Sequence, residues 1–204
     1  MTYFDTHRYD GCFTLGKDMT YESTGILVCG NNKNLTNKLC ALMKDRGVEM
    51  VYPDTLDELN EAGSMLESLM MTRFRNMKAE QVNHVFKLKE SVKPVCLVIS
   101  NINQFFKDNS QLVVDARTHI SSVIRLGKFT GIYVLVCCDA YKPKVIGADM
   151  ENNLITRFYT DTVTNLDDVL FLHDKGYDNK HIPEDHVVCV SSNTILQGQI
   201  ADIK

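Results

Sequence analysis

The stretch ILVCGNNKNLTNKLCALMKDRGVEMVY, residues 26–52, decides the fold. It opens with an apolar run, residues 26–29, that lacks polar and apolar alternation, as strands covered on both faces do. A polar loop follows, then an amphipathic segment at about residues 35–46, which Gly47 is suited to end as a helix. The next apolar run, residues 48–52, predicts a second strand. Strand, helix and strand form a βαβ unit, which indicates a parallel sheet.

The rest of the chain repeats this pattern. Three further apolar runs predict buried strands at residues 95–100, 132–138 and 155–160. Apolar residues at helical spacing predict helices over residues 55–78 and from about Ser110 to Gly127. Two β-like runs close the chain, at residues 187–190 and 194–200, and predict an antiparallel hairpin. The expected fold class is α/β, with a mostly parallel buried sheet flanked by helices and an antiparallel edge hairpin.

Composition bounds the class of protein. With 204 residues, 44% hydrophobic and 24% charged, the chain suits one domain over residues 1–204, in which residues 1–24 add an edge hairpin. No apolar run approaches the roughly 20 residues that span a bilayer, and the N-terminus shows no targeting pattern, so a cytoplasmic location is expected. A net charge of −4 gives no global attraction to nucleic acid. Four of the seven cysteines fall within apolar runs and are expected to be reduced core thiols.

A nucleotide loop is expected directly after the strand at residues 26–29. A P-loop needs glycines so that backbone N–H groups surround phosphates, a lysine for the β- and γ-phosphates, and a Ser or Thr for magnesium. The first glycine is Gly30, but the second glycine, the lysine and the hydroxyl positions hold Leu35, Thr36 and Asn37. Lys33 or Lys38 is a candidate substitute for the missing lysine. The degenerate loop consists of Gly30, Asn31, Asn32, Lys33, Asn34, Leu35, Thr36, Asn37 and Lys38.

A second nucleotide element is altered as well. An active ATPase carries an Asp for the magnesium shell, and an acidic residue that polarises water, at the end of the strand that corresponds to residues 95–100. Ser100 and Asn101 stand there instead. A neutral amide is a poor general base and a serine supplies no negative charge to a metal. We therefore expect no catalytic residues and no bound cofactor, with ATP and Mg²⁺ required only if the chain is a divergent motor.

The order of these pieces resembles the motor domain of the FtsK/SpoIIIE/HerA translocase group, over roughly residues 11 to 178. The resemblance implies a RecA-like P-loop fold, and the degenerate motifs are similar to those of the last ATPase domains of EssC-like type VII secretion proteins. A phage or mobile-element subunit is an equally good setting. Beyond the nucleotide motifs, the matching residues are Leu15-Gly16-Lys17-Asp18, Arg73-Phe74, Val82-Asn83, Gly131-Ile132, Pro143 and Thr156-Arg157-Phe158.

The resemblance also supplies candidate residues and partners. Where the family's sensor strand ends in a polar phrase that monitors the γ-phosphate, this chain has Asp139 in the phrase Cys138–Pro143. Arg125 and Arg157, together with Arg117, are candidates for an arginine that reaches a neighbour's nucleotide, although surface ion pairing is the simpler interpretation. The implied partners are FtsK-like subunits in a homo- or hetero-oligomeric ring, with a translocated protein or DNA.

The functional prediction is a catalytically degenerate FtsK-like domain that acts as a structural, assembly or substrate-docking module of a translocation machine. One alternative is an active, divergent DNA translocase or packaging subunit, in which Lys33 or Lys38 and Asp139 take over the lost roles. Another is a small-molecule enzyme on an unrelated doubly wound sheet. No metal site is expected, because His181 and His186 flank a short loop that is more typical of solvated surface.

Overall fold

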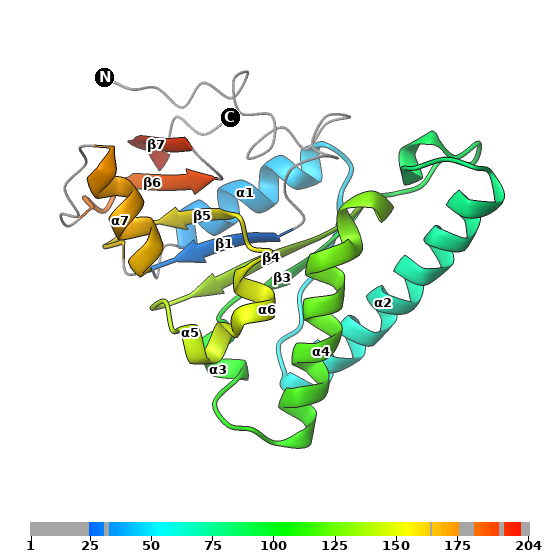
Figure 1. The fold of residues 1–204 in the computed structure, drawn as a ribbon, viewed down its shortest axis with the longest axis horizontal. Helices are drawn as coiled ribbons and strands as arrows, with labels where there is room; N and C mark the ends of the chain where they lie inside the picture. The colour runs from blue at the N-terminus through cyan, green and yellow to red at the C-terminus, as the bar shows by residue number, and fades with distance from the viewer. Residues whose placement is uncertain (1–24, 31–32, 164, 176–181, 192–193, 201–204) are drawn as a thin grey trace.

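The computed structural model describes residues 25–30, 33–163, 165–175, 182–191 and 194–200 (Figure 1). These residues contain a seven-stranded sheet in the order β2-β3-β4-β1-β5-β6-β7. The strands are β1 (Gly25–Cys29), β2 (Glu49–Val51), β3 (Val95–Ile99), β4 (Ile132–Cys138), β5 (Thr156–Tyr159), β6 (His186–Ser191) and β7 (Thr194–Gln199). The hairpin predicted for residues 1–24 lies outside the described residues.

The strand directions confirm a mostly parallel sheet with an antiparallel edge. Strands β1 to β5 pair in parallel, whereas β5 pairs antiparallel with β6 and β6 pairs antiparallel with β7. In the doubly wound dinucleotide fold β1 and β2 are neighbours. Here β3 and β4 lie between them, and β1 sits between β4 and β5. This order differs from that of the doubly wound sheet, which the small-molecule-enzyme alternative assumed, and agrees with the RecA-like prediction.

Nine helical segments connect the described strands. They are α1 (Lys33–Asp45), α2 (Leu56–Ala79), η1 (Val85–Lys87), α3 (Ile102–Phe105), α4 (Gln111–Leu126), η2 (Gly127–Thr130), α5 (Pro143–Ile146), α6 (Ala148–Glu151) and α7 (Leu166–Asp174). The longest, α2, begins with a capping box, in which the Thr55 side chain accepts a hydrogen bond from the Glu58 N–H at 3.2 Å. The Glu58 carboxylate in turn accepts from the Thr55 N–H at 3.4 Å.

One predicted helix start was wrong by two residues, whereas the predicted end of another helix at Gly127 was confirmed, with a different backbone conformation. The first helix begins at Lys33 rather than near residue 35, which leaves a shorter loop after β1. The helix predicted to end in a cap at Gly127 does end there, but Gly127 is right-handed, with φ −61°. The chain continues through η2, and the left-handed residue is Gly131, with φ 68°. A single 3₁₀ turn therefore tightens the connection into β4.

The helices cover the sheet on two faces, and each face has its own core cluster (Figure 1). On one face α1 packs Leu35, Leu39 and Met43 against alternate residues of β1, β3 and β4. On the other face α2 and α4 pack against the intervening residues of the same strands. Because both faces are covered, the strands need no alternation, which is why they appear as unbroken apolar runs.

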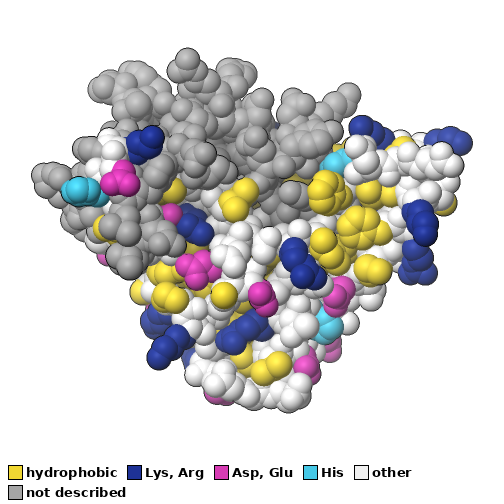
Figure 2. All heavy atoms as spheres, viewed as in Figure 1, with side chains coloured by type: hydrophobic (Ala, Val, Ile, Leu, Met, Phe, Trp, Pro, Cys, Tyr) yellow, Lys and Arg dark blue, Asp and Glu magenta, His cyan; other side chains and the backbone are white. Residues whose placement is uncertain are grey.

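The surface gives no sign of a polyanion-binding field on the face that Figure 2 shows. There the Lys and Arg side chains of described residues are interspersed with Asp and Glu side chains, and hydrophobic side chains gather near α2 and α4. Mixed signs of charge leave little long-range attraction for a phosphate backbone. Within the described part of the chain, no helix combines the length and the apolar character needed to cross a bilayer.

Candidate functional site

A cavity of about 450 Å³ lies where β1, β3 and β4 end and α1 begins. Ligands of open α/β sheets bind outside the carboxyl ends of the strands, so this is the expected position for a nucleotide. The lining residues are Gly30, Lys33, Thr36, Asn37, Cys40, Tyr52, Val98, Ser100, Asn101, Gln104, Cys137, Cys138 and Asp139. The cavity therefore brings together the degenerate loop, the altered strand end and the sensor candidate.

Gly30 retains the backbone role of the first glycine in a phosphate loop. Its φ is 103°, a conformation that favours glycine, and its N–H donates to the Cys138 carbonyl at 2.9 Å. A Cβ at this position would lie 2.3 Å from the Thr160 Oγ1 on the neighbouring segment. Residues 31–32 of the loop lie outside the described residues. The turn that starts a P-loop is thus preserved at its first residue.

The second half of the loop has become part of a helix. Because α1 begins at Lys33, the positions that would form an open phosphate cradle lie in its first turn. Leu35, at the position of the second glycine, is fully buried in the core beneath α1. The Leu35 side chain points into the protein interior. A glycine at the same position would have no side chain and would let a phosphate approach the backbone.

Thr36 stands at the position of the P-loop lysine and faces a strand. Its Oγ1 lies 3.4 Å from the Cys137 Sγ of β4. A threonine side chain is too short to reach from the helix to β- and γ-phosphates as a lysine does. Thr36 therefore joins α1 to the sheet and supplies no cation to the cavity.

The two proposed substitute lysines are separated by the structure. Lys33 is exposed and lines the cavity. Lys38 is not among the lining residues, and its Nζ donates to the Ile200 carbonyl at 2.9 Å, beyond β7. Of the two lysines, Lys33 alone lies where it could contact a phosphate.

The strand end that should carry acidic residues has neutral ones with structural roles. Ser100 is exposed at the cavity wall. Asn101 caps the short helix α3, because its Oδ1 accepts from the Asn103 N–H at 3.1 Å. Neither residue supplies the negative charge that a magnesium shell or a general base requires.

Asp139, the sensor candidate, places a carboxylate at the cavity wall. Its Oδ1 accepts a short hydrogen bond from the Asn103 amide, which also donates to the Ala140 carbonyl at 2.8 Å. The Asn103 hydrogen bond lowers the pKa of Asp139, and the Ala140 N–H and Lys142 act in the same direction. The carboxylate is therefore held ionised and oriented at the end of β4.

The three arginine candidates are elsewhere. Arg117 and Arg125 lie on α4, outside the cavity. Arg157 on β5 pairs with Asp168 of α7, with the Arg157 Nη1 2.8 Å from the Asp168 Oδ1, and both side chains are largely buried. The Tyr159 hydroxyl donates to the other oxygen of Asp168. This pairing ties β5 to α7, and it leaves Arg157 poorly placed to reach a neighbouring subunit.

The structure adds cavity residues that sequence reasoning missed. Tyr52 follows β2 and lies beside Cys40 of α1 in the cavity lining. Burial of the Tyr52 hydroxyl, together with the nearby Cys40, raises the pKa of Tyr52 to about 12. Gln104 of α3 also lines the cavity. An isolated tyrosine after a strand and a glutamine in a four-residue helix carry no recognisable motif. Both approach the cavity only through the chain's tertiary arrangement.

The cysteines at this site are buried. The six described cysteines are free and buried, so the cysteines predicted to lie in the core do lie there. Burial raises the pKa of Cys137 to about 12. A thiol that stays protonated at neutral pH is a weak nucleophile and a weak metal ligand.

The histidine loop offers no metal site among the residues that can be described. His186 lies 2.6 Å from the Asp185 carboxylate through its Nδ1, and His181 falls outside the described ranges. Over the described residues, no group of three His, Cys, Asp or Glu side chains is arranged to hold a metal ion.

Comparisons with known proteins place the fold. No family model matches the sequence, and no curated protein matches it. Among solved structures, the pCW3 conjugation coupling protein TcpA, in a monomer form with ATPγS, matches with a TM-score of 0.73 and 16% identity over 89% of this chain. EssC ATPases 2 and 3 from Geobacillus thermodenitrificans match with a TM-score of 0.70 and 12% identity over 91% of this chain.

A third similar structure is the cytoplasmic domain of the type VII secretion ATPase EccC of Thermomonospora curvata, with a TM-score of 0.60 and 8% identity over 86% of this chain. The chain spans 61% of the TcpA structure, 40% of the EssC structure and 25% of the EccC structure. These likenesses confirm the RecA-like P-loop fold that the FtsK/SpoIIIE resemblance predicted. At such low identity they establish the fold and leave the function to the site.

Proposed function

We propose that this chain is a non-hydrolysing FtsK-type domain that serves as a structural, assembly or substrate-docking module of a DNA or protein translocation machine. The contact between Thr36 and Cys137 carries the proposal. It puts a short side chain, turned toward the sheet, where a hydrolysing domain holds a phosphate-binding lysine. On this proposal the cavity at the strand ends remains, but the side chains that would bind phosphate and magnesium are absent from it.

Two further substitutions also support a domain that does not hydrolyse ATP. Leu35 fills core volume at the glycine position, and Ser100 and Asn101 replace the acids of the magnesium shell. Phosphoryl transfer depends on positioned cations that neutralise the developing charge. A domain that lacks the P-loop lysine and the metal-binding acid has lost both sources of that neutralisation.

The fold suggests the setting of such a module. The structurally similar proteins are a conjugation coupling protein and type VII secretion ATPases. We propose that this chain assembles with FtsK-like subunits, as a homo- or hetero-oligomer, next to a translocated protein or DNA. Sedimentation velocity of the purified chain, alone and mixed with an active FtsK-like ATPase from the same source, tests this assembly.

A divergent motor is the second candidate, and one observation favours it. Lys33 and Asp139 line the same cavity, so a cation and a carboxylate are both present where a nucleotide would lie. In that case Lys33 would contact the phosphates and Asp139 would hold the metal. Lys38, bonded to the Ile200 carbonyl, has no part in this alternative.

Isothermal titration with ATP and Mg²⁺ separates the two candidates. We expect no heat of binding at millimolar nucleotide, and no phosphate release in a coupled hydrolysis assay. Micromolar affinity that Lys33→Ala removes and Lys38→Ala retains, together with hydrolysis, would establish the motor instead. Lys38→Ala is the matched control, because it removes the same charge from the same helix outside the cavity.

A further inference from the structure

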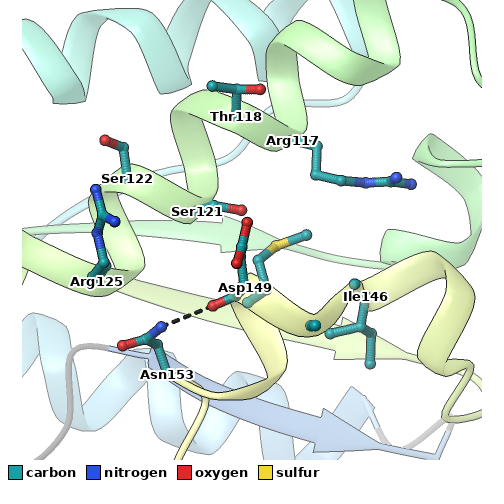
Figure 3. A pocket seen from close by; sticks show the side chains of 11 residues that line it. Arg117, Thr118, Ser121, Ser122, Arg125, Ile146, Asp149 and Asn153 are labelled. Atoms are coloured by element: carbon teal, nitrogen blue, oxygen red, sulfur yellow. Dashed lines mark hydrogen bonds between the residues drawn. The ribbon is translucent and has the colours of Figure 1, made fainter.

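A second hollow lies between α4 and the segment that contains α5 and α6 (Figure 3). Its volume is about 300 Å³, and it shares no lining residue with the cavity at the strand ends. We call it the α4–α6 groove. One wall is the α4 face that bears Arg117, Ser121 and Arg125, and the opposite wall contains Gly147, Asp149 and Asn153.

The α4 wall presents a regular row of donors. Arg117, Ser121 and Arg125 are spaced four residues apart, so they lie on one face of the helix, about 6 Å apart along its axis. Figure 3 shows all three on the stretch of α4 that borders the groove. Among the described residues, none of the three side chains has a hydrogen-bond or ion-pair partner. Two guanidinium groups and a hydroxyl are therefore available to a ligand.

Arg117 is held in place without being neutralised. Its guanidinium lies over the Phe106 ring, 5.0 Å from the centroid. Its stem passes Gly147, where an added Cβ would lie 3.9 Å from the Arg117 Cδ. The Nε is buried and has no partner among the described residues. The side chain as a whole is half-buried, so its terminal nitrogens, rather than the Nε, are the donors that an oxyanion in the groove could reach.

Asp149 determines what kind of anion fits. It is exposed on the opposite wall, and in the view of Figure 3 it lies between the positions of Arg117 and Arg125. The three charged side chains sum to +1, which suits one anionic group. A polyphosphate or a nucleic-acid strand would place further negative charge against Asp149. A ligand hydroxyl, in contrast, could donate to it.

We propose that the α4–α6 groove binds a small phosphorylated molecule that carries a hydroxyl group next to its phosphate. The phosphate contacts donors of the α4 wall, which are Arg117, Ser121 and Arg125, and Asp149 accepts a hydrogen bond from the hydroxyl. Arginine suits this task because its planar fork bonds two phosphate oxygens at once.

Titration with glycerol 3-phosphate, inorganic phosphate and glycerol tests the proposal, with ¹⁵N NMR shifts or heat as the readout. We expect glycerol 3-phosphate to bind most tightly, inorganic phosphate more weakly, and glycerol not at all. Arg117→Gln should weaken glycerol 3-phosphate by at least about tenfold, since a hydrogen bond to a charged group is lost. Asp149→Asn should reduce the advantage of glycerol 3-phosphate over inorganic phosphate.

Two controls make the result specific. Arg75→Gln removes one positive charge from the exposed face of α2, and Lys33→Ala removes one from the other cavity; both should leave the affinity unchanged. If Arg117→Gln proves unfolded by circular dichroism, Arg117→Lys and Arg125→Gln decide the question, and each should weaken binding. The proposal would be overturned if wild type showed no binding at millimolar glycerol 3-phosphate. It would also be overturned if folded Arg117 and Arg125 variants bound glycerol 3-phosphate as tightly as wild type does.

Discussion

The hydroxyl of Thr36 lies 3.4 Å from the sulfur of Cys137, and this contact joins α1 to β4 where a phosphate loop would stay open. One residue earlier, Leu35 is buried in the core cluster of the same face. Together the two residues pack the first turns of α1 against the sheet.

Replacing Leu35 with alanine should destabilise the domain. Leu35 is fully buried, and a Leu→Ala change in a core costs about 2–5 kcal/mol through lost transfer energy and the cavity left behind. Urea unfolding followed by circular dichroism gives the difference. Leu42→Ala, on the half-buried side of the same helix, should cost clearly less. Equal costs would show that Leu35 does not anchor α1.

Gly30 and Gly47 allow strain and steric clash to be separated. Both have positive φ, 103° and 78°, so alanine at either position is strained. A Cβ at Gly47 would meet no atom within 4 Å, whereas one at Gly30 would lie 2.3 Å from the Thr160 Oγ1. Gly30→Ala should therefore lower the melting temperature more than Gly47→Ala. Adding Thr160→Ala should recover part of the loss at Gly30 and none at Gly47.

Asn103 should control the titration of Asp139. Asn103→Ala removes the side-chain hydrogen bond that lowers the pKa of Asp139, so this pKa should rise toward about 3.9. Carbon-detected NMR of the carboxyl group measures it directly. Asp108, whose pKa is lowered by hydrogen bonds from Ser110, should titrate alike in both proteins and serves as the internal control. An unchanged Asp139 pKa would contradict the assigned contact.

The same contact predicts the sign of a pH effect on stability. The pKa of Asp139 is lowered in the folded state, so its contribution is fully present above the unfolded value of about 3.9. That contribution is lost as the pH falls through the folded pKa. The stability difference between wild type and Asn103→Ala should therefore shrink below about pH 4. A residual, pH-independent difference should remain, because the variant also loses the bond to the Ala140 carbonyl.

The sequence predicted the sheet well because its strands are buried on both faces. The runs at residues 26–29 and 132–138 became β1 and β4, since a short, continuous apolar run is typical of a strand in the middle of a covered sheet. The start of α1 was harder to predict. Asn31 and Asn34 have similar tendencies in loops and in first helical turns, and the burial of Leu35 against the sheet decides the boundary.

The candidate site was predictable in position but not in its contacts. Motif spacing placed Gly30, Ser100 and Asp139 at strand ends, and the structure brings all three to one cavity. The partners of these positions are set by tertiary structure. Thr36 and Cys137 are 101 residues apart in the chain, and Asn103 and Asp139 are 36 apart. No local pattern encodes such pairs, so the sequence could not show that Thr36 faces a thiol.

Arg73 should be far more important for stability than its neighbour Arg75, two residues along α2. Arg73 is buried, and its guanidinium donates to the Thr130 carbonyl at 2.7 Å and to the Lys93 carbonyl at 2.6 Å. It thereby joins α2 to the chain entering β3 and β4. Arg73→Ala would leave both carbonyls without that donor, and we expect a loss of about 3 kcal/mol in the free energy of unfolding.

Arg75→Ala is the matched control for this change. Arg75 is exposed, and among the described residues its side chain bonds only within its own helix, to the Met71 carbonyl at 3.4 Å and the Thr72 hydroxyl at 3.3 Å. Its removal should alter the free energy of unfolding by less than about 0.5 kcal/mol. Denaturant titration of both variants measures the contrast. Equal losses of stability in the two variants would show that Arg73 does not fix α2 to the sheet. The Arg73-Phe74 pair, which carries part of the FtsK/SpoIIIE resemblance, would then need another role, and a contact with a partner subunit becomes the hypothesis to test.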